Sequence, residues 1–441
     1  MAVLREDEIE SFIKYSHYLG PKQFSLKPIR EKHDPKFVKK LIDRSIDVLN
    51  EKGLNEVKGD SFFVGSVDFM VYGEEENRKL CIIETNGGNS RGVSSLTLEQ
   101  WKGIIDGYLE SLNFLNSDSP LILIVHPEED LLFYEKIALA ENLARKLRES
   151  RKEVRIIRAR EYEGEKLKEI PKLILCSYPE LRASLFLEGD EPIFKQEKVD
   201  LIIGDGAARR HMELRNAALS RRFKALIVNR VFPITDDKHL TYKAVEEGMD
   251  FLMDSNIYPL ISWHAKDKDE LEQLCLEALR EVGEIVIKPH GGSGGCGIYN
   301  ISDEEEVREK IDKSIREFHE KYGALRNPFP YTICEKVRLK PISWKGSPRI
   351  FDVRIYVARR GDKVYPIGGL ARIALEPYFE RPSKRSLVVN LSGYGGVDTS
   401  RGLGLSEDSL KLLQLSEEDL MNMFCSAAAL FSSIANSYEA D

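Results

Sequence analysis

The chain has 441 residues, of which 42% are hydrophobic and 31% charged, as in ordinary globular proteins with room for two or three domains. A formal net charge of −8 argues against nucleic acid or an anionic membrane as the main partner. No apolar run is long enough to span a bilayer and the first residues lack a signal-peptide pattern, so we expect a cytoplasmic protein. The six cysteines are scattered without metal-binding spacing and are expected to be reduced core residues.

Two apolar strands are predicted near the N-terminus, at residues 64–72 and 79–88, and they carry three oxygen-bearing side chains. The polar run between them predicts a hairpin turn that places Asp68 opposite Glu84, and Asn86 shares their face two residues further on. Two carboxylates that face each other in apolar surroundings need a cation or a neutralising proton. Because hard oxygen ligands suit magnesium, the pattern predicts a Mg²⁺ site; a solvated strand end is the alternative interpretation.

From about residue 118 the pattern changes to short apolar strands that alternate with helices, which is typical of a parallel sheet with helices on its faces. This stretch is predicted to be a Rossmann-like α/β unit. It has no glycine-rich first turn, because His126-Pro127 follows the first strand, so no NAD site is expected. The predicted domains are residues 1–117, the Rossmann-like residues 118–235, and residues 236–441.

A glycine-rich loop is the main feature of the third part. A strand at residues 284–288 runs into five glycines within residues 291–297, whose backbone amides suit anionic oxygens. The spacing matches GxGxxG only formally, because another strand is expected before the helix that a capping box at Ser302 begins, and no Walker A Gly-Lys-Ser/Thr follows. The pattern therefore predicts a strand–loop–strand flap over nucleotide phosphates, with Lys288 at its base. Earlier in the chain, Lys238 lies at a strand-to-helix junction, where a plain surface charge is the alternative.

Charged residues also interrupt the later strands. One apolar strand ends in Glu335-Lys336 and can offer backbone groups to an adenine edge, although a solvated edge strand has the same pattern. Arg354 and Arg372 each interrupt an apolar strand, and their planar donors suit charge that moves between a phosphoryl group and an acyl oxygen. Either arginine can instead be a structural ion-pair partner, for example Arg354 with Asp352.

Together these segments resemble the ATP-grasp superfamily, whose members usually make an acyl phosphate from a carboxylate and ATP and pass the acyl group to an amine. The Asp and Glu-x-Asn strands ordinarily close that fold, whereas here they come near the N-terminus. The order resembles that of circularly permuted ATP-grasp ligases similar to glutathionylspermidine synthase. Relatives often carry an arginine two residues before the metal-binding Asp, where this chain has Ser66, so Arg354 or Arg372 would have to supply that charge.

The resemblance implies an α/β fold, a permuted ATP-grasp with a Rossmann-like pre-ATP-grasp domain, and an ATP-dependent carboxylate–amine ligase that forms an amide or peptide bond and releases ADP and phosphate. An ATP-grasp kinase and a non-catalytic ATP-binding protein are the alternatives. The implied cofactors are ATP and two Mg²⁺ ions. The implied partners are a small carboxylate and an amine, such as an amino acid or peptide, with no nucleic acid or membrane and with homodimer formation left open. The implied site residues are Asp68, Glu84 and Asn86 for the metal; Lys238, Lys288, Gly291, Gly292, Ser293, Gly294, Gly295, Glu335, Lys336 and Val337 for the nucleotide; Arg354 and Arg372 for catalysis; and Asn390, Gly395 and Gly396 for the substrate.

Overall fold

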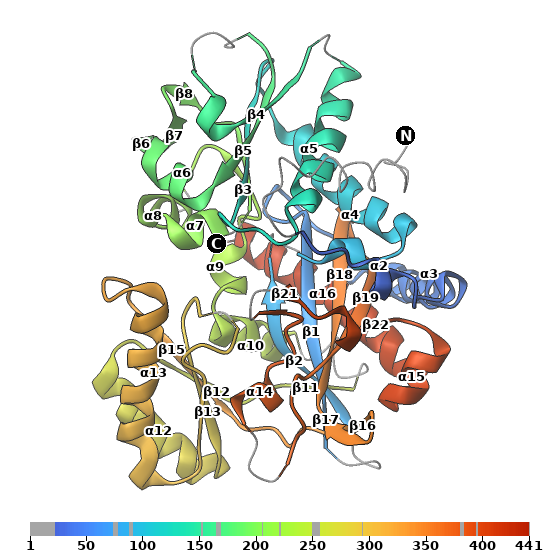
Figure 1. The fold of residues 1–441 in the computed structure, drawn as a ribbon, viewed down its shortest axis with the longest axis vertical. Helices are drawn as coiled ribbons and strands as arrows, with labels where there is room; N and C mark the ends of the chain where they lie inside the picture. Colours follow the sequence, from blue (N-terminus) through green and yellow to red (C-terminus); the bar gives the residue numbers. More distant parts are fainter. Residues whose placement is uncertain are drawn as a thin grey trace.

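The structure, a computed structural model, is built on three larger β-sheets of six, five and four strands (Figure 1). The five-stranded sheet lies at the top of Figure 1, the six-stranded sheet at the centre right and the four-stranded sheet at the lower left. Among the described helices, none combines the length and hydrophobicity that crossing a membrane requires. The described residues are 23–73, 78–87, 91–150, 153–164, 169–204, 206–219, 222–248, 256–292, 294–379, 383–393 and 396–440.

The six-stranded sheet joins strands from both ends of the chain. In sheet order its strands are β11 (Ile257–Tyr258), β2 (Lys79–Asn86), β1 (Val64–Tyr72), β18 (Phe351–Arg360), β19 (Lys363–Ile373) and β22 (Gly402–Gly404). β1 and β2 form the predicted antiparallel pair, and β1 also pairs antiparallel with β18. The N-terminal and C-terminal parts of the chain therefore share one sheet, and Asp68 lies directly opposite Arg354 across the β1–β18 pair.

Helices cover both faces of this sheet. On one face lie α3 (Pro35–Lys52) and α16 (Glu417–Ala440), and on the other lies α4 (Leu98–Glu110). Neighbouring aromatic residues before β1 divide between the faces, because Phe62 joins the α16 cluster and Phe63 joins the α4 cluster. α16 lies so close to β1 that a Cβ at Gly65 would be 2.5 Å from the Phe431 ring, so only glycine fits there.

The five-stranded sheet is parallel, as the alternating pattern predicted. Its order is β10 (Leu226–Val228), β9 (Leu201–Ile203), β3 (Leu121–His126), β5 (Lys172–Ser177) and β4 (Arg155–Arg158). β3, β5, β9 and β10 are buried along their whole length, since α5 (Phe133–Arg148) covers one face and α6 (Tyr178–Ser184) and α7 (Gly206–Arg210) cover the other. Residues of α4 and α5 lie in one apolar cluster, so the parallel and six-stranded sheets share a core.

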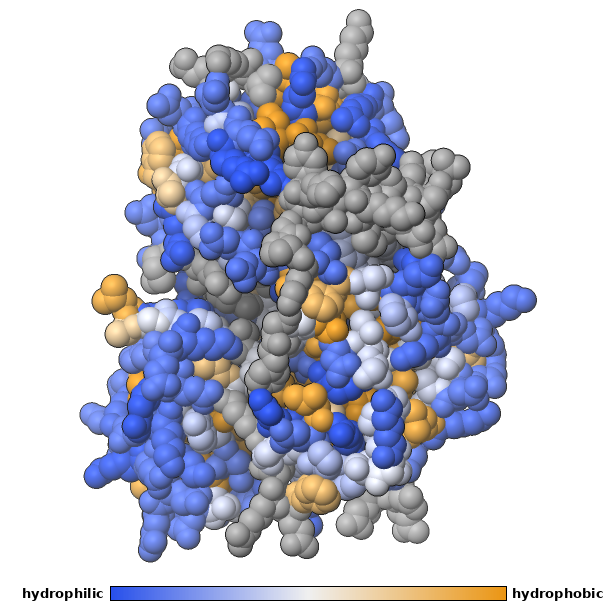
Figure 2. Space-filling model, viewed as in Figure 1, coloured by the Kyte–Doolittle hydropathy of each residue, from blue (hydrophilic) through white to orange (hydrophobic). Residues whose placement is uncertain are grey.

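The four-stranded antiparallel sheet carries the glycine-rich loop between two adjacent strands. Its order is β12 (Ser262–Ala265), β15 (Tyr331–Glu335), β13 (Ile285–Pro289) and β14 (Tyr299–Ile301), and α12 (Lys268–Val282) and α13 (Val307–Tyr322) pack on it. The predicted strand after the glycines is thus confirmed. The helix start predicted at Ser302 is wrong, because Asp303 instead caps a 3-10 turn before α13 by accepting from the Glu305 amide. Hydrophilic residues dominate the exposed surface over α12 and α13 (Figure 2).

Shorter elements connect these layers, and the antiparallel strands β6, β7 and β8 were not predicted. The remaining described elements are α2 (Lys27–Arg30), η3 (Val93–Ser95), η4 (Ser111–Phe114), η5 (Ala159–Glu161), β6 (Leu185–Glu188), β7 (Glu191–Phe194), β8 (Glu197–Lys198), α8 (Met212–Leu219), α9 (Phe232–Thr235), α10 (Lys238–Glu247), η8 (Glu304–Glu306), β16 (Ile342–Trp344), β17 (Ser347–Arg349), α14 (Lys384–Leu387), β20 (Ser392–Gly393), β21 (Gly396–Val397), η9 (Thr399–Arg401) and α15 (Glu407–Leu413).

Phe431→Ala is expected to lower the free energy of unfolding by about 3–5 kcal/mol. The ring is fully buried, stacks on Phe62 with centroids 4.5 Å apart, and fills the space above Gly65, so its removal leaves a cavity between α16 and the sheet. Denaturant unfolding measures the change. Phe379→Ala is the matched control because that ring is 62% exposed, and equal losses in the two variants would contradict this packing.

Candidate active site

The hairpin brings its oxygen-bearing side chains together as the position of the turn predicted. Asp68 pairs with Glu84 and Ser66 pairs with Asn86 across the two strands, and the register shifts between Asp68 and Phe69. Side chains two residues apart on a strand share a face, so all four lie on one side of the sheet. Ser66 Oγ and Asn86 Nδ2 are buried and have no hydrogen-bond partner among the described residues. This face therefore has polar atoms that a bound ligand could contact.

Two arginines and two aspartates form a buried charge network beside the hairpin. Arg354 donates from Nε to Asp68 Oδ1 and from Nη2 to Oδ2, both at 2.7 Å. Arg372 Nη2 donates to Asp68 Oδ2 at 2.9 Å, while Arg372 also binds Asp352 through Nε at 2.8 Å and through Nη2. Burial alone would raise the pKa of Asp68, but Arg354 and Arg372 hold it well below its usual value. We call these four residues the charge quartet.

The charge quartet changes two expectations. The alternative ion pair of Arg354 with Asp352 is wrong, because cross-strand register places Arg354 opposite Asp68 and Arg372 opposite Asp352. Both carboxylate oxygens of Asp68 are already bound by guanidinium groups, so its charge is balanced without a cation. The other carboxylate of the hairpin, Glu84, binds Lys238 rather than an arginine of the charge quartet.

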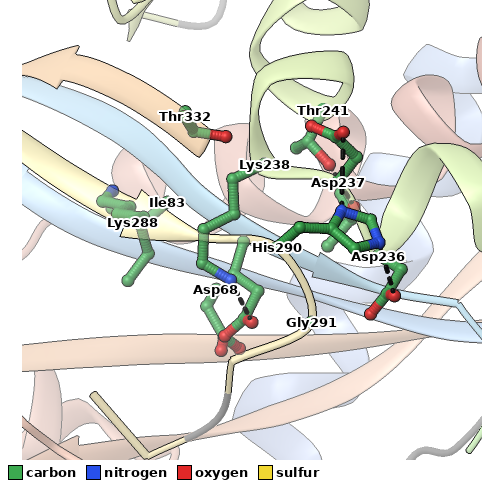
Figure 3. Close-up of polar contacts among 12 residues, drawn as sticks. Asp68, Ile83, Asp236, Asp237, Lys238, Thr241, Lys288, His290, Gly291 and Thr332 are labelled. Atoms are coloured by element: carbon green, nitrogen blue, oxygen red, sulfur yellow. Dashed lines mark hydrogen bonds and ion pairs between the residues drawn. The ribbon is translucent and has the colours of Figure 1, made fainter. Parts of the chain in front are cut away.

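Lys238 is the partner of Glu84 in this structure. Lys238, which is labelled in Figure 3, is the first residue of α10. Its Nζ lies 2.9 Å from Glu84 Oε1. Two further contacts fix α10 against β2: the hydroxyls of Thr85 and Thr241 are 2.8 Å apart, and Tyr242 Oη donates to the Ile83 carbonyl at 3.0 Å. Burial opposes ionisation of Glu84, but the Lys238 ammonium holds the pKa of this carboxyl below its usual value. Lys238 is thus directed into the site rather than towards solvent.

Lys288 and the glycine loop lie on the neighbouring sheet. Lys288 Nζ donates to Tyr242 Oη at 2.7 Å, and its β13 backbone pairs with Thr332 of β15. Gly291, Gly294, Gly295 and Gly297 all have positive φ values, between 63° and 74°, which other residues rarely adopt. Ser293, also expected in this loop, lies outside the described residues.

The predicted adenine-binding segment, residues 335–337, is held in place by contacts of its two charged side chains. Glu335 Oε2 accepts from Tyr258 Oη at 3.0 Å and Oε1 accepts from the Ile261 amide at 2.9 Å. Lys336 Nζ lies 3.0 Å from Glu284. Val337 packs into an apolar cluster that includes Met70, Cys81, Leu260 and Cys334 and lies between the six-stranded and four-stranded sheets.

One pocket of about 280 Å³ brings together several of the predicted residues. The parallel sheet contributes to it at the carboxyl ends of its strands, through Pro127, Tyr178 and Gly206. The predicted residues that line it are Glu84, Asn86, Gly292, Gly294, Arg354, Arg372 and Asn390. Gly396 lines an adjoining pocket that also includes Gly294 and Asn390, while Gly395 lies outside the described residues.

Arg91 was missed by the sequence analysis although it lines both pockets. Its guanidinium binds Asp130 of the β3–α5 connection, and its carbonyl accepts from Tyr356 Oη of β18 at 2.9 Å. The next amide, of Gly92, donates to buried Glu135 at 3.1 Å. The two sheets together therefore position Arg91. The only local signal was its place shortly after the Glu-x-Asn strand, which by itself does not separate Arg91 from other loop residues.

No protein-family model matches the chain, and no curated protein sequence matches it. Among solved structures, a proposed gamma-glutamylcysteine synthetase from Methylobacillus flagellatus is 12% identical, with a TM-score of 0.49 over 92% of this chain and 96% of that one. A glutathione synthetase-like effector from Globodera pallida is 13% identical, with a TM-score of 0.42 over 83% of each chain. D-alanyl-alanine synthetase A from Vibrio cholerae is 12% identical, with a TM-score of 0.32 over 70% of this chain and 82% of that one. These values mark distant similarity.

Arg372→Met is expected to lower the free energy of unfolding by about 3–5 kcal/mol, because it leaves Asp352 buried without its partner. Adding Asp352→Asn removes the unpaired charge and is expected to recover part of the loss, as measured by denaturant unfolding. Lys39→Met is the control, since the Lys39–Asp43 pair is 59% and 56% exposed and should contribute little. Unfolding of Arg372→Met at the same denaturant concentration as the original chain would show that the charge quartet does not constrain the sheet.

Proposed function

We propose that the chain is an ATP-dependent carboxylate–amine ligase with a circularly permuted ATP-grasp arrangement, and that it releases ADP and phosphate. The observation that carries this proposal is the single pocket lined by Glu84 and Asn86 of the hairpin, Gly292 of the glycine loop, and both arginines of the charge quartet. Oxygen ligands, backbone donors and guanidinium groups around one volume suit phosphoryl transfer to a carboxylate. The pairing of β1 with β18 supports the permutation, because the early hairpin completes a sheet of late strands.

ATP is proposed to bind between the six-stranded and four-stranded sheets. The apolar cluster around Cys334 and Val337 suits an adenine ring, and backbone groups of residues 335–337 suit its polar edge. Lys238 and Lys288 hold Glu84 and Tyr242 at 2.9 and 2.7 Å, and phosphate oxygens can replace both partners. The amides of Gly291, Gly292, Gly294 and Gly295 would then cover the phosphates.

The residues present fit a magnesium ion next to Glu84. Ser66 Oγ is a buried oxygen without a partner among the described residues, and Asn86, which carries an amide oxygen, lines the same pocket as Glu84. The ion-pair partner of Glu84 in this structure is Lys238, whose contact a cation can replace. Bound there, Mg²⁺ would neutralise phosphate charge and polarise a phosphoryl oxygen. Glu84 would exchange its contact with Lys238 for the cation, which frees the ammonium for the phosphates. Because both oxygens of Asp68 are bound by arginines, the residues present suit one ion better than the two expected.

The proposed reaction has two steps in the same pocket. A substrate carboxylate oxygen attacks the γ-phosphorus and the bond to ADP breaks, which gives an acyl phosphate. An amine nitrogen then attacks the acyl carbon, phosphate leaves, and the amine loses a proton. Arg354 uses Nε and Nη2 for Asp68, so the donors of Nη1 remain for a phosphoryl or acyl oxygen. Arg91, on the pocket wall, suits a second anionic group of a substrate such as an amino acid or a peptide.

A screen for ATP-dependent phosphate release with pairs of L-amino acids and dipeptides tests this function. The expected result is an amide product in proportion to ADP. A phosphorylated acceptor without an amide would identify a kinase, and absence of ADP with every pair would identify a non-catalytic protein.

Glu84→Gln is expected to slow phosphate release by about 100-fold or more, because an amide cannot balance the charge of the bound cation. Glu99→Gln, at an exposed acidic residue in the first turn of α4, is the matched control and should release phosphate at the original rate. Release by Glu84→Gln as fast as by the original chain would refute the metal assignment.

A further inference from the structure

His290 begins the glycine-rich loop and has no part in the reaction described above. Its side chain is only 7% exposed and lies between two carboxylates (Figure 3). Nε2 is 3.4 Å from Asp236 Oδ2, and Nδ1 is 3.6 Å from Asp237 Oδ2. Nδ1 is also a buried atom without a hydrogen-bond partner among the described residues. A buried imidazole in this setting joins the loop to the residues that directly precede Lys238.

Asp237 is itself held in one orientation. As the N-cap of α10, its Oδ1 accepts from the backbone amides of His239 at 2.9 Å and Leu240 at 3.2 Å. Its Oδ2 lies 3.2 Å from His264 Nε2 on β12. Burial opposes ionisation, but the His264 and His290 imidazoles beside the carboxylate hold the pKa of Asp237 well below its usual value. The carboxylate is therefore a fixed, charged anchor on the helix that starts with Lys238.

Contacts from two other segments converge on His290 and Gly291, which we call the root of the glycine loop. Arg215 of α8, in the part of the chain that follows the parallel sheet's β9, donates to His290 Nε2. The His290 amide donates to the Pro328 carbonyl at 2.9 Å, and Arg326 Nη2 donates to the Gly291 carbonyl at 2.9 Å. When Nε2 accepts from Arg215, the ring proton is on Nδ1, which faces Asp237. The imidazole thus lies where the glycine loop, α8 and α10 meet.

We propose that His290 is a positioning residue that fixes the root of the glycine loop relative to Lys238, so that the loop amides and the lysine ammonium meet the same phosphates. This inference rests on the proposed function, because it requires ATP to bind beneath the loop. The cap of α10 uses the His239 and Leu240 amides, and the backbone bond from His290 to the Pro328 carbonyl does not use the imidazole, so both contacts remain when the ring is removed. The predicted loss in a variant is therefore one of nucleotide affinity, without a matching loss of fold.

Calorimetric titration with Mg²⁺ and the non-hydrolysable analogue AMP-PNP tests the role of His290. His290→Ala is expected to weaken binding by about tenfold or more, through loss of charge-assisted contacts. His290→Asn, whose amide can still donate to Asp237, is expected to retain part of the affinity. His319→Ala, the same substitution at the end of α13, is the control and should bind as the original chain does.

A double variant separates positioning from general destabilisation. If His290 acts through the placement of Lys238, then His290→Ala combined with Lys238→Met should weaken binding by less than the product of the two single effects. Unchanged binding by His290→Ala, an equal loss in His290→Asn and His290→Ala, or fully multiplicative effects would overturn the proposal. If His290→Ala does not fold, the same comparison is made with His290→Asn. Failure of the original chain to bind AMP-PNP would instead refute the proposed function, whereas binding without phosphate release would refute only the ligase reaction.

Discussion

A carboxylate cannot stay ionised inside an apolar sheet without a partner. In this protein, that constraint links β1, near the N-terminus, to β18 and β19 of the later part of the chain. Asp68 finds its partners 286 and 304 residues later, in Arg354 and Arg372. Replacing such a network by apolar residues is often neutral for stability, but removing one member leaves an uncompensated charge. Because a one-residue slip in register moves every side chain to the other face, the quartet specifies how β1, β18 and β19 align.

The arrangement around Glu84 follows from that alignment. The arginines neutralise Asp68, and Glu84, opposite it on β2, is left to Lys238. Lys288 comes from a different sheet but shares α10 as its contact, through Tyr242. Lys238 and Lys288 thus each have a protein partner that an anionic ligand can replace. A nucleotide with its cation would exchange these ion pairs for phosphate contacts, so binding need not create a new unpaired charge.

Local sequence patterns were sufficient for features that depend on neighbours in the chain. The continuous apolar strands predicted the parallel sheet, the polar turn predicted the pairing of Asp68 with Glu84, and the glycines flanked by β-formers predicted a strand–loop–strand unit. The division into three domains and the roles of the site residues stay predictions. Features that depend on partners from distant segments were not accessible, because nothing in a local pattern identifies such a partner. Examples are the pairing of Arg372 with both Asp68 and Asp352 and the placement of Arg91 by Tyr356 and Asp130.

A hairpin near the N-terminus and a glycine loop from the later part of the chain are proposed to bind one metal–nucleotide complex. A crystal structure with ADP and Mn²⁺, in which anomalous scattering locates the ion, tests it most directly. We expect a Mn²⁺ peak about 2.0–2.3 Å from oxygens of Glu84 and Asn86, with the ADP phosphates beneath the glycine loop and beside Lys238 and Lys288. ADP bound elsewhere, or an ion that Glu84 does not contact, would contradict it.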